Sequence, residues 1–432
     1  MHRRPRRDRP RGSYDGRVAA AFIALAALVL AAVAVVALRS RRPRAAVLST
    51  APPRPHELAM LGKALLGREP EPGELADGLT LAEAAAAITA GAAHREAVAA
   101  GQAGVLAGSA LAEELLPPGT PSPDGAAVVG TEGRLYIAHG ANDFIRQYRG
   151  ETPLSPEGVA SWSALLDRTR AEADALGVPL VPLVIPDKLA IDPAGYPEPL
   201  AAGLRRPIHQ LLEARPGALV YPLDELQRAH RRTPVSLRTD SHINSAGAQV
   251  VHDVVVARLG LARAGRRPPR PERSYVMAGD LGVKFTPKVH ELAQAPEAGP
   301  GIELVEDNAR TILDLGGHLG VRRVTRNERA PVDGRLVVFG DSYSYIEPAV
   351  AGNLGEFLAR TFREVHFLWA PFCWDAGYLS RHPPDAVVLQ MAERFAITVP
   401  REGADVEALA VETLRRKGGI VPEEITDPAV TT

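Results

Sequence analysis

The longest uninterrupted apolar run of the chain lies close to its start. Residues 18–38, VAAAFIALAALVLAAVAVVAL, contain neither a charged residue nor a proline. As a helix rising about 1.5 Å per residue, this run just spans a hydrocarbon core of about 30 Å. The apolar segment of a cleaved signal peptide is shorter, about 7–15 residues. The pattern therefore predicts a retained transmembrane helix.

Arginine is dense on both sides of this run. Residues 1–17 carry seven arginines, and RSRRPR at 39–44 supplies four more. Because positive charge is higher before the apolar run, the positive-inside rule favours a cytoplasmic tail at 1–17. We therefore expect a single-pass protein of the inner (plasma) membrane, with the rest of the chain outside the cytoplasm.

The next segment, 39–125, has two parts. A basic and proline-rich linker covers 39–56, and an Ala/Leu/Glu-rich stretch with helical character covers 57–116. Thr80 stands three residues before Glu83, which is a capping-box pattern at a helix start. PPGTPSPDG at 117–125 breaks the pattern and predicts a boundary. The segment is expected to be a linker followed by a helical stalk or small subdomain.

From residue 126 onward, short apolar runs alternate with helical patterns. A hairpin is expected at 127–140. Strands are expected at 178–186, 217–223, 335–340, 364–370 and 385–392, and helices at 155–177, 207–215, 245–260 and 352–362. The prolines in 178–186 make it irregular or an edge strand. This alternation predicts an α/β domain over 126–400, a parallel sheet flanked by helices, with a C-terminal tail at 401–432. The stretch 265–330 gives no clear pattern.

Composition narrows the function classes. The net charge of −1 argues against a nucleic-acid partner. A single cysteine, Cys373, excludes an intramolecular disulfide and a cysteine-based metal site, and we predict no metal centre. No glycine-rich phosphate loop is visible, and no bound cofactor is predicted.

The first candidate for chemistry is Ser342, which follows the apolar run LVVF with only Gly340 and Asp341 between them. In open α/β sheets, ligands bind at the carboxyl ends of the strands. A serine on such a turn can act as a nucleophile, with backbone N–H groups of a following helix stabilising an oxyanion. The alternative is that Asp341 or Ser342 only caps a helix.

The second candidate lies in RTDSHINSAGAQ, 238–249, where Asp240 and His242 precede a predicted helix. A hydroxyl needs a base such as imidazole, and the imidazole needs an acceptor that fixes its tautomer. Asp240 and His242 meet these needs if their loop brings them together with Ser342. The alternative is a capping aspartate beside a surface histidine.

Together, FGDSYS and the earlier DSHIN resemble the alginate O-acetyltransferase proteins of the AlgJ/AlgX kind, an SGNH-hydrolase-like family of extracytoplasmic polysaccharide acetylation. Four further segments match that family in order: GTEGRLYIAHG, VIPDK, AGDLG and PPDAVVLQMAERF. The resemblance covers about residues 126–398. The acid and base precede the serine, which is the circularly permuted order of that family and the reverse of ordinary SGNH hydrolases.

The resemblance implies Ser342 as nucleophile, His242 as base and Asp240 as its orienting partner, with the Ser342 N–H in the oxyanion hole. Asp341 is then a turn-shaping neighbour. Three further residues are candidates for substrate contact, each with a structural alternative: Tyr343 as a packing residue, Arg394 in an ion pair with Glu393, and Lys188 as a structural or solvated lysine. One departure is Ile243, where the family usually has tryptophan, which puts the glycan preference in doubt.

The implied function is a membrane-anchored O-acetyltransferase that acylates a polysaccharide through an acetyl-serine. Its acetyl donor would be relayed by a multi-pass membrane O-acyltransferase, because acetyl-CoA is not available outside the cytoplasm. Three alternatives stay open. The same triad with water as acceptor makes an acetyl-esterase. A non-catalytic glycan-binding or assembly protein would keep the fold, and a pure scaffold would work through 57–116.

Overall fold

The computed structural model describes residues 49–201, 204–261, 272–297, 301–346, 352–400, 403 and 405–418. Contacts divide the chain into Met1–Arg44 and Ala45–Thr432, and all described residues belong to the second unit. Among them, no helix is long and apolar enough to cross a membrane. The predicted span at 18–38 and the basic tail at 1–17 lie outside the described residues.

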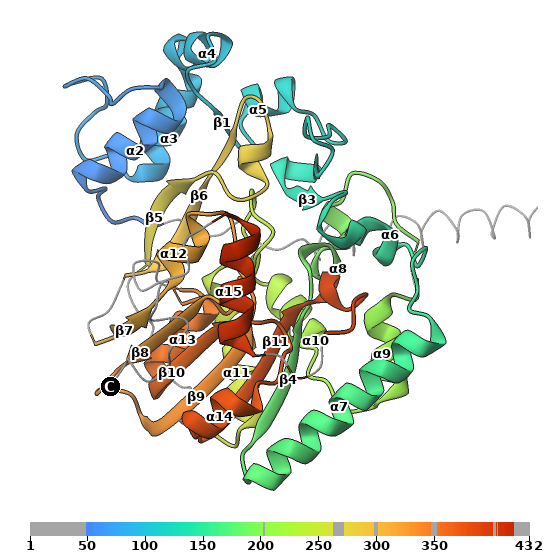
Figure 1. The fold of residues 1–432 in the computed structure, drawn as a ribbon. Helices are drawn as coiled ribbons and strands as arrows, with labels where there is room; N and C mark the ends of the chain where they lie inside the picture. The colour runs from blue at the N-terminus through green and yellow to red at the C-terminus, as the bar shows by residue number, and fades with distance from the viewer. Residues whose placement is uncertain are drawn as a thin grey trace, which may run out of the picture. The chain divides into compact units, whose positions relative to one another are not determined.

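The centre of the described unit is a six-stranded sheet (Figure 1). Its strands, in order across the sheet, are β4 (Leu180–Ile185), β11 (Ala386–Ala392), β9 (Val332–Gly340), β10 (Phe362–Trp369), β8 (Arg322–Arg326) and β7 (Glu303–Asp307). The first four run parallel, and β8 and β7 add antiparallel pairs. The expected α/β sheet is therefore confirmed, but it is mixed rather than wholly parallel.

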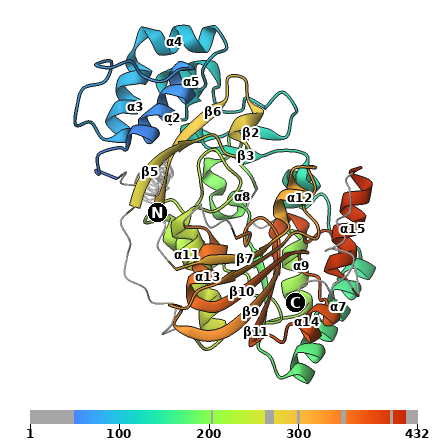
Figure 2. The ribbon, with the colours of Figure 1, turned by 60° about the vertical axis from the view of Figure 1, so that its left-hand side comes forward.

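Helices cover both faces of this sheet (Figure 2). One face packs against α10 (Leu223–His230), α11 (Ser245–Arg258) and α13 (Leu354–Thr361), and the other against α7 (Pro156–Leu176), α9 (Pro207–Ala214) and α14 (Ala376–Arg381). Neighbouring residues of β9 alternate between these faces, Val338 on the first and Val337 and Phe339 on the second. The result is a three-layer arrangement whose central strands are buried on both sides.

Local signals account for several of these elements. Ser155 caps α7, its side chain accepting from the Gly158 N–H, and Pro156 is the first helical residue. The proline-containing strand β4 is an edge strand of the sheet, as predicted. The strand expected at 217–223 is reduced to a single bridge between Val220 and Leu183, because Pro222 lacks an N–H and α10 begins directly after it.

The Ala-rich region forms α2 (Pro55–Leu66), α3 (Leu81–Ala90), α4 (Ala92–Ala99) and α5 (Ala110–Leu115). The predicted capping box is present, because Thr80 and Glu83 exchange backbone-to-side-chain hydrogen bonds. The helices α2 and α3 share a small core with Val276 of β5 (Glu272–Met277) (Figure 1). Strand β1 (Val105–Leu106) and β5 both pair with β6 (Val289–Pro296) in a three-stranded sheet.

The remaining elements are short. The predicted hairpin consists of β2 (Ala127–Val129) and β3 (Leu135–Ile137), and the other helices are α6 (Phe144–Tyr148), α8 (Lys188–Ile191), α12 (Ala309–Leu313) and α15 (Val406–Arg416). Helix α15 lies in the stretch predicted as a tail, and it buries Val406, Ala410 and Leu414. The division of the chain into domains stays a prediction.

Candidate active site

The nucleophile turn, residues 341–344, follows β9 directly. It is a turn closed by the Ser344 N–H donating to the Asp341 carbonyl at 3.0 Å, and not the start of a helix as expected. The buried Asp341 carboxylate accepts from the Tyr343 N–H at 3.0 Å, and from the Gln390 amide and the Ala392 N–H of β11 at 2.8 and 2.6 Å. Asp341 therefore shapes the turn that presents Ser342, and it ties that turn to the neighbouring strand.

The base loop, residues 238–242, lies before α11. Its backbone folds so that Asp240 Oδ1 accepts from both the N–H and the Nδ1 of His242, at 2.9 and 2.6 Å. The helix begins at Ser245 as predicted, and the side chain that caps it belongs to Asn244, which accepts from the Gly247 N–H at 3.1 Å. A spacing of two residues thus suffices for contact because the loop turns between them.

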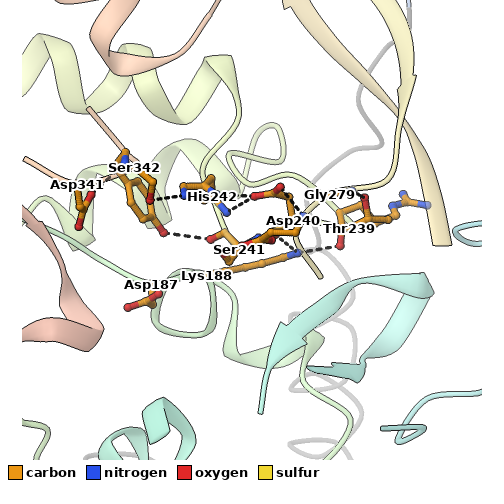
Figure 3. A network of polar contacts seen from close by, with 12 residues as sticks. Asp187, Lys188, Thr239, Asp240, Ser241, His242, Gly279, Asp341 and Ser342 are labelled. Carbon is orange, nitrogen blue, oxygen red and sulfur yellow. Dashed lines mark hydrogen bonds and ion pairs between the residues drawn. The ribbon is translucent and has the colours of Figure 1, made fainter. Parts of the chain in front are cut away.

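The two loops meet at the carboxyl end of β9. His242 Nε2 lies 2.8 Å from Ser342 Oγ, so a continuous hydrogen-bond chain runs from Asp240 through the imidazole to the hydroxyl (Figure 3). With Nδ1–H donating to the carboxylate, Nε2 is free to accept from the serine O–H. The His242 side chain is 26% exposed and Ser342 is partly buried, so a substrate can reach both.

Electrostatics favour an ionised acid beside a strong base. Burial opposes the charge of Asp240, but hydrogen bonds from His242 and from the Asp280 N–H outweigh it and hold the pKa of this carboxyl below its usual range. Burial likewise opposes the imidazolium, and Asp240 outweighs it and raises the pKa of His242. A base with a raised pKa holds a proton more firmly once it has taken it.

A second carboxylate, that of Asp280, lies next to the base loop and hydrogen-bonds to it. The Asp280 N–H donates to Asp240 Oδ2 at 2.9 Å, and the Asp280 carboxylate accepts from the Ser241 N–H and Oγ–H at 2.7 and 2.6 Å. The preceding Gly279 lies directly against the base loop, where a Cβ would be 2.4 Å from that of Asp240. Sequence reasoning assigned no role to Asp280, although AGDLG was one of the matching segments.

Two buried charged side chains, those of Glu291 and Lys188, hold the base loop through hydrogen bonds to its backbone. Glu291 of β6 accepts from the N–H groups of Arg238 and Thr239 at 2.8 and 2.7 Å, and from the Thr239 hydroxyl at 2.8 Å. The Lys188 ammonium donates to the carbonyls of Arg238 and Asp240 at 2.9 and 3.2 Å (Figure 3). Lys188 is thus a positioning residue, and its predicted contact with substrate stays a prediction. Glu291 carried no recognisable signal in the sequence.

Tyr343 joins the two loops. It is 3% exposed, and its hydroxyl donates to the Ser241 carbonyl at 3.0 Å while its ring centroid lies 4.7 Å from that of His242. The Arg394 guanidinium lies 5.6 Å from the centre of the tyrosine ring. These contacts give Tyr343 a structural role, and its contact with a sugar stays a prediction.

Arg394 is buried and has an ion-pair partner other than the one considered from sequence. Its guanidinium pairs with Asp187 at 2.5 Å, and its N–H donates to the same carboxylate at 2.8 Å. The neighbouring Glu393 instead pairs with Arg206 at 2.8 Å and accepts from the Tyr221 hydroxyl. Substrate contact by Arg394 likewise stays a prediction.

The remaining groups of the site are the Ser342 N–H and the oxygens of its two carboxylates. Among the described residues, the Ser342 N–H donates no hydrogen bond, which leaves it available to a substrate oxygen. One ligand atom each from Asp240, His242 and Asp280 lies within 4.8 Å of the others. Every carboxylate oxygen of this group also accepts a hydrogen bond from the protein.

No protein-family model matches the sequence, and no curated protein matches it significantly. Among solved structures, the O-acetyltransferase domain of Pseudomonas putida AlgJ is 15% identical, with 70% of this chain and 97% of that chain covered and a TM-score of 0.40. Bacillus cereus PatB1 with a sulfonyl adduct is 10% identical, with 64% and 96% covered and a TM-score of 0.43. Pseudomonas aeruginosa AlgX is 15% identical, with 62% and 61% covered and a TM-score of 0.33. AlgJ and AlgX, which the sequence resemblance names, are thus among the solved structures to which this chain is similar.

Proposed function

We propose that the chain is a membrane-anchored O-acetyltransferase that transfers acetyl groups to hydroxyls of an extracytoplasmic polysaccharide. The observation that supports it is the hydrogen-bond chain of Asp240, His242 and Ser342, which is open to solvent at the carboxyl edge of the sheet. This arrangement serves acyl transfer through a serine nucleophile. The choice of acetyl as the acyl group, and of a glycan as acceptor, comes from the sequence resemblance.

In the first half-reaction, Ser342 Oγ attacks the carbonyl carbon of an acetyl ester while His242 Nε2 takes the hydroxyl proton. The tetrahedral intermediate carries a negative oxygen, to which the Ser342 N–H donates. The bond to the donor oxygen then breaks, and the leaving alkoxide takes the proton from His242. The products are acetyl-Ser342 and the deacetylated donor.

In the second half-reaction, a sugar hydroxyl attacks the acetyl carbon of acetyl-Ser342, and its proton passes to His242 Nε2. Collapse of the second tetrahedral intermediate breaks the bond to Ser342 Oγ, which recovers its proton from the imidazole. Asp240 stays ionised throughout and stabilises the imidazolium in both steps. Water in place of the sugar gives hydrolysis, and the acetyl-esterase is therefore the alternative that shares every residue.

The catalytic assignment is tested with the full chain and a chromogenic acetyl ester. Ser342→Ala should lower kcat/KM by at least about 10³-fold and abolish acetylation of the nucleophile turn, read by peptide mass spectrometry. Ser344→Ala is the matched control, because this serine lies two residues on and its buried hydroxyl has no hydrogen-bond partner in the described structure. Turnover by the Ser342→Ala variant equal to that of an active parent chain would refute the assignment, and turnover by neither chain would favour a non-catalytic glycan-binding protein.

The acceptor is tested by adding oligosaccharides to the same assay. Acetylated oligosaccharide in the mass spectrum, formed by the parent chain and absent with Ser342→Ala, would support transfer. Hydrolysis that no oligosaccharide alters, with no acetylated sugar, would identify an esterase.

The proposal also includes anchoring through residues 18–38 and an acetyl donor delivered by a multi-pass membrane O-acyltransferase. Release of the chain from membranes by salt alone would contradict the anchor.

A further inference from the structure

Aromatic side chains gather beside the nucleophile turn, at the carboxyl end of β10. Trp369 is the last residue of this strand and pairs in register with Gly340, two residues before Ser342. Tyr345 follows Ser342 by three residues. The ring centroids of Tyr345 and Trp369 are 5.4 Å apart, and the His318 ring lies 4.8 Å from that of Trp369. We call these three rings the aromatic platform.

The rings of the aromatic platform are more exposed to solvent than the other tryptophans of the chain. Trp369 and Tyr345 are only partly buried and His318 is exposed, whereas the other two tryptophans, Trp162 and Trp374, are 0% and 6% exposed. Apolar rings left open at the ligand-binding edge of a sheet are typical of ligand-binding grooves. Partial desolvation of the ring and the nearby Lys417 ammonium lower the pKa of His318.

Neighbouring side chains also fix the positions of the Tyr345 and Trp369 rings. Phe367, fully buried in β10, contacts the Tyr345 and Trp369 rings edge-on at 5.6 and 5.9 Å. The Arg323 guanidinium lies 4.7 Å from the centre of the Tyr345 ring, and two bonds of 3.0 Å from Arg323 to Asp307 hold it there. A surface whose side chains are fixed in advance binds a ligand at a lower entropic cost.

We propose that the aromatic platform is the subsite for a sugar ring of the acceptor glycan. A pyranose presents an apolar C–H face that stacks on an aromatic ring, and its hydroxyls project sideways from that stack. Trp369 is the register partner of Gly340, so the indole belongs to the strand next to the one that leads into Ser342. This inference rests on the proposed function for its ligand class, and it assigns acceptor recognition to residues other than Tyr343.

The test measures glycan binding without turnover, in the full chain carrying Ser342→Ala. The probes are cellohexaose, which is neutral, and a mannuronate hexamer, which is acidic. Tryptophan fluorescence should change saturably with at least one probe, because Trp369 is the most accessible of the three tryptophans. No saturable change with either probe overturns the proposal without relying on any platform variant.

Variants then locate the site by calorimetric titration in the same background. Trp369→Leu should weaken binding by about tenfold, and Trp369→Phe, which keeps a ring, should weaken it less. The matched control is Leu176→Ala, which removes an exposed apolar side chain at the end of α7. Unchanged affinity in Trp369→Leu, with the fold retained by circular dichroism, overturns the proposal.

The two proposals fail separately. If the parent chain forms acetyl-Ser342 but the Ser342→Ala chain binds neither probe, the platform is not a glycan subsite and the catalytic assignment stands. If the Ser342→Ala chain binds a probe through Trp369 and the parent chain forms no acetyl-enzyme, the platform stands and the catalytic assignment falls.

Discussion

Gly279 offers the sharpest test of how the triad acid is held. It lies two residues after β5, and its backbone is in direct contact with the base loop. A methyl group added here would have its carbon 2.4 Å from Asp240 Cβ, 2.7 Å from Asp240 Cα and 2.6 Å from the Thr239 carbonyl oxygen. All three atoms belong to the loop backbone or its first side-chain carbon, so no rotamer change relieves the contact. Gly279→Ala must therefore displace Asp240.

The displacement can be estimated from ordinary contact distances. Non-bonded carbons approach to about 3.5–4.0 Å, against the 2.4 Å that the new methyl would have. Asp240 must therefore move by about 1 Å relative to Gly279, which disrupts its 2.6 Å contact with His242 Nδ1. A misplacement of this size costs about 10²-fold in rate. The overpacking itself should lower the free energy of unfolding by about 1–3 kcal/mol.

The assay is kcat/KM for hydrolysis of a chromogenic acetyl ester, with thermal unfolding measured on the same samples. Gly91→Ala is the control, because a Cβ at Gly91 meets only two carbonyl oxygens at 3.4 and 3.8 Å and its φ of −82° suits alanine. The control should keep its activity. If Gly279→Ala matches the parent in both activity and unfolding temperature, the contact does not constrain Asp240 and the reasoning is wrong.

Three further predictions concern the surrounding residues. Because neutral His242 is the active form and its pKa is raised, activity should fall as the pH drops through that pKa. Asp280→Asn removes a neighbouring negative charge, so the fall in activity should shift to lower pH. An unchanged pH profile would contradict the role of Asp280. Burial lowers the pKa of Lys188 from 10.5 to about 8, so the unfolded chain holds one more proton between these values and stability rises with pH across that window, by up to about 3 kcal/mol. Lys188→Met should abolish that rise in denaturant titrations, and an identical pH dependence would refute the assignment. Tyr343→Phe removes one hydrogen bond between the two loops and should lower kcat by about tenfold with little change in KM; a change confined to KM would point instead to substrate contact.

Much of the layered core could be predicted because its signals are local. The helix at 155–177 has its own cap, and the runs that became β9, β10 and β11 are mostly apolar because both faces of the sheet are covered there. The strands β7 and β8 could not be predicted in the same way. Their sequences, ELVED and RRVTR, are polar because they lie at or next to the edge of the sheet. They are strands because β8 pairs with β10 and β7 pairs with β8.

The candidate site shows the same limit. Ser342 follows a strand and His242 precedes a helix, so each residue type could be singled out from its own segment. The residues that hold the base loop through hydrogen bonds could not be predicted. Asp280 and Glu291 reach that loop from segments about forty and fifty residues later in the chain, and no local pattern distinguishes a carboxylate that anchors a distant loop from one that only meets water.

The supports of the two loops come from different parts of the chain. The nucleophile turn is fixed from β11 through Asp341, whereas the base loop is fixed by Lys188, Glu291 and Asp280. The loops meet through the imidazole and the Tyr343 hydroxyl. Because different residues support the two loops, their geometry depends on where these segments lie in the fold and not on their order along the chain. A circularly permuted order is therefore compatible with an intact hydrogen-bond chain, and what the fold must conserve is the meeting of the two loops at one sheet edge.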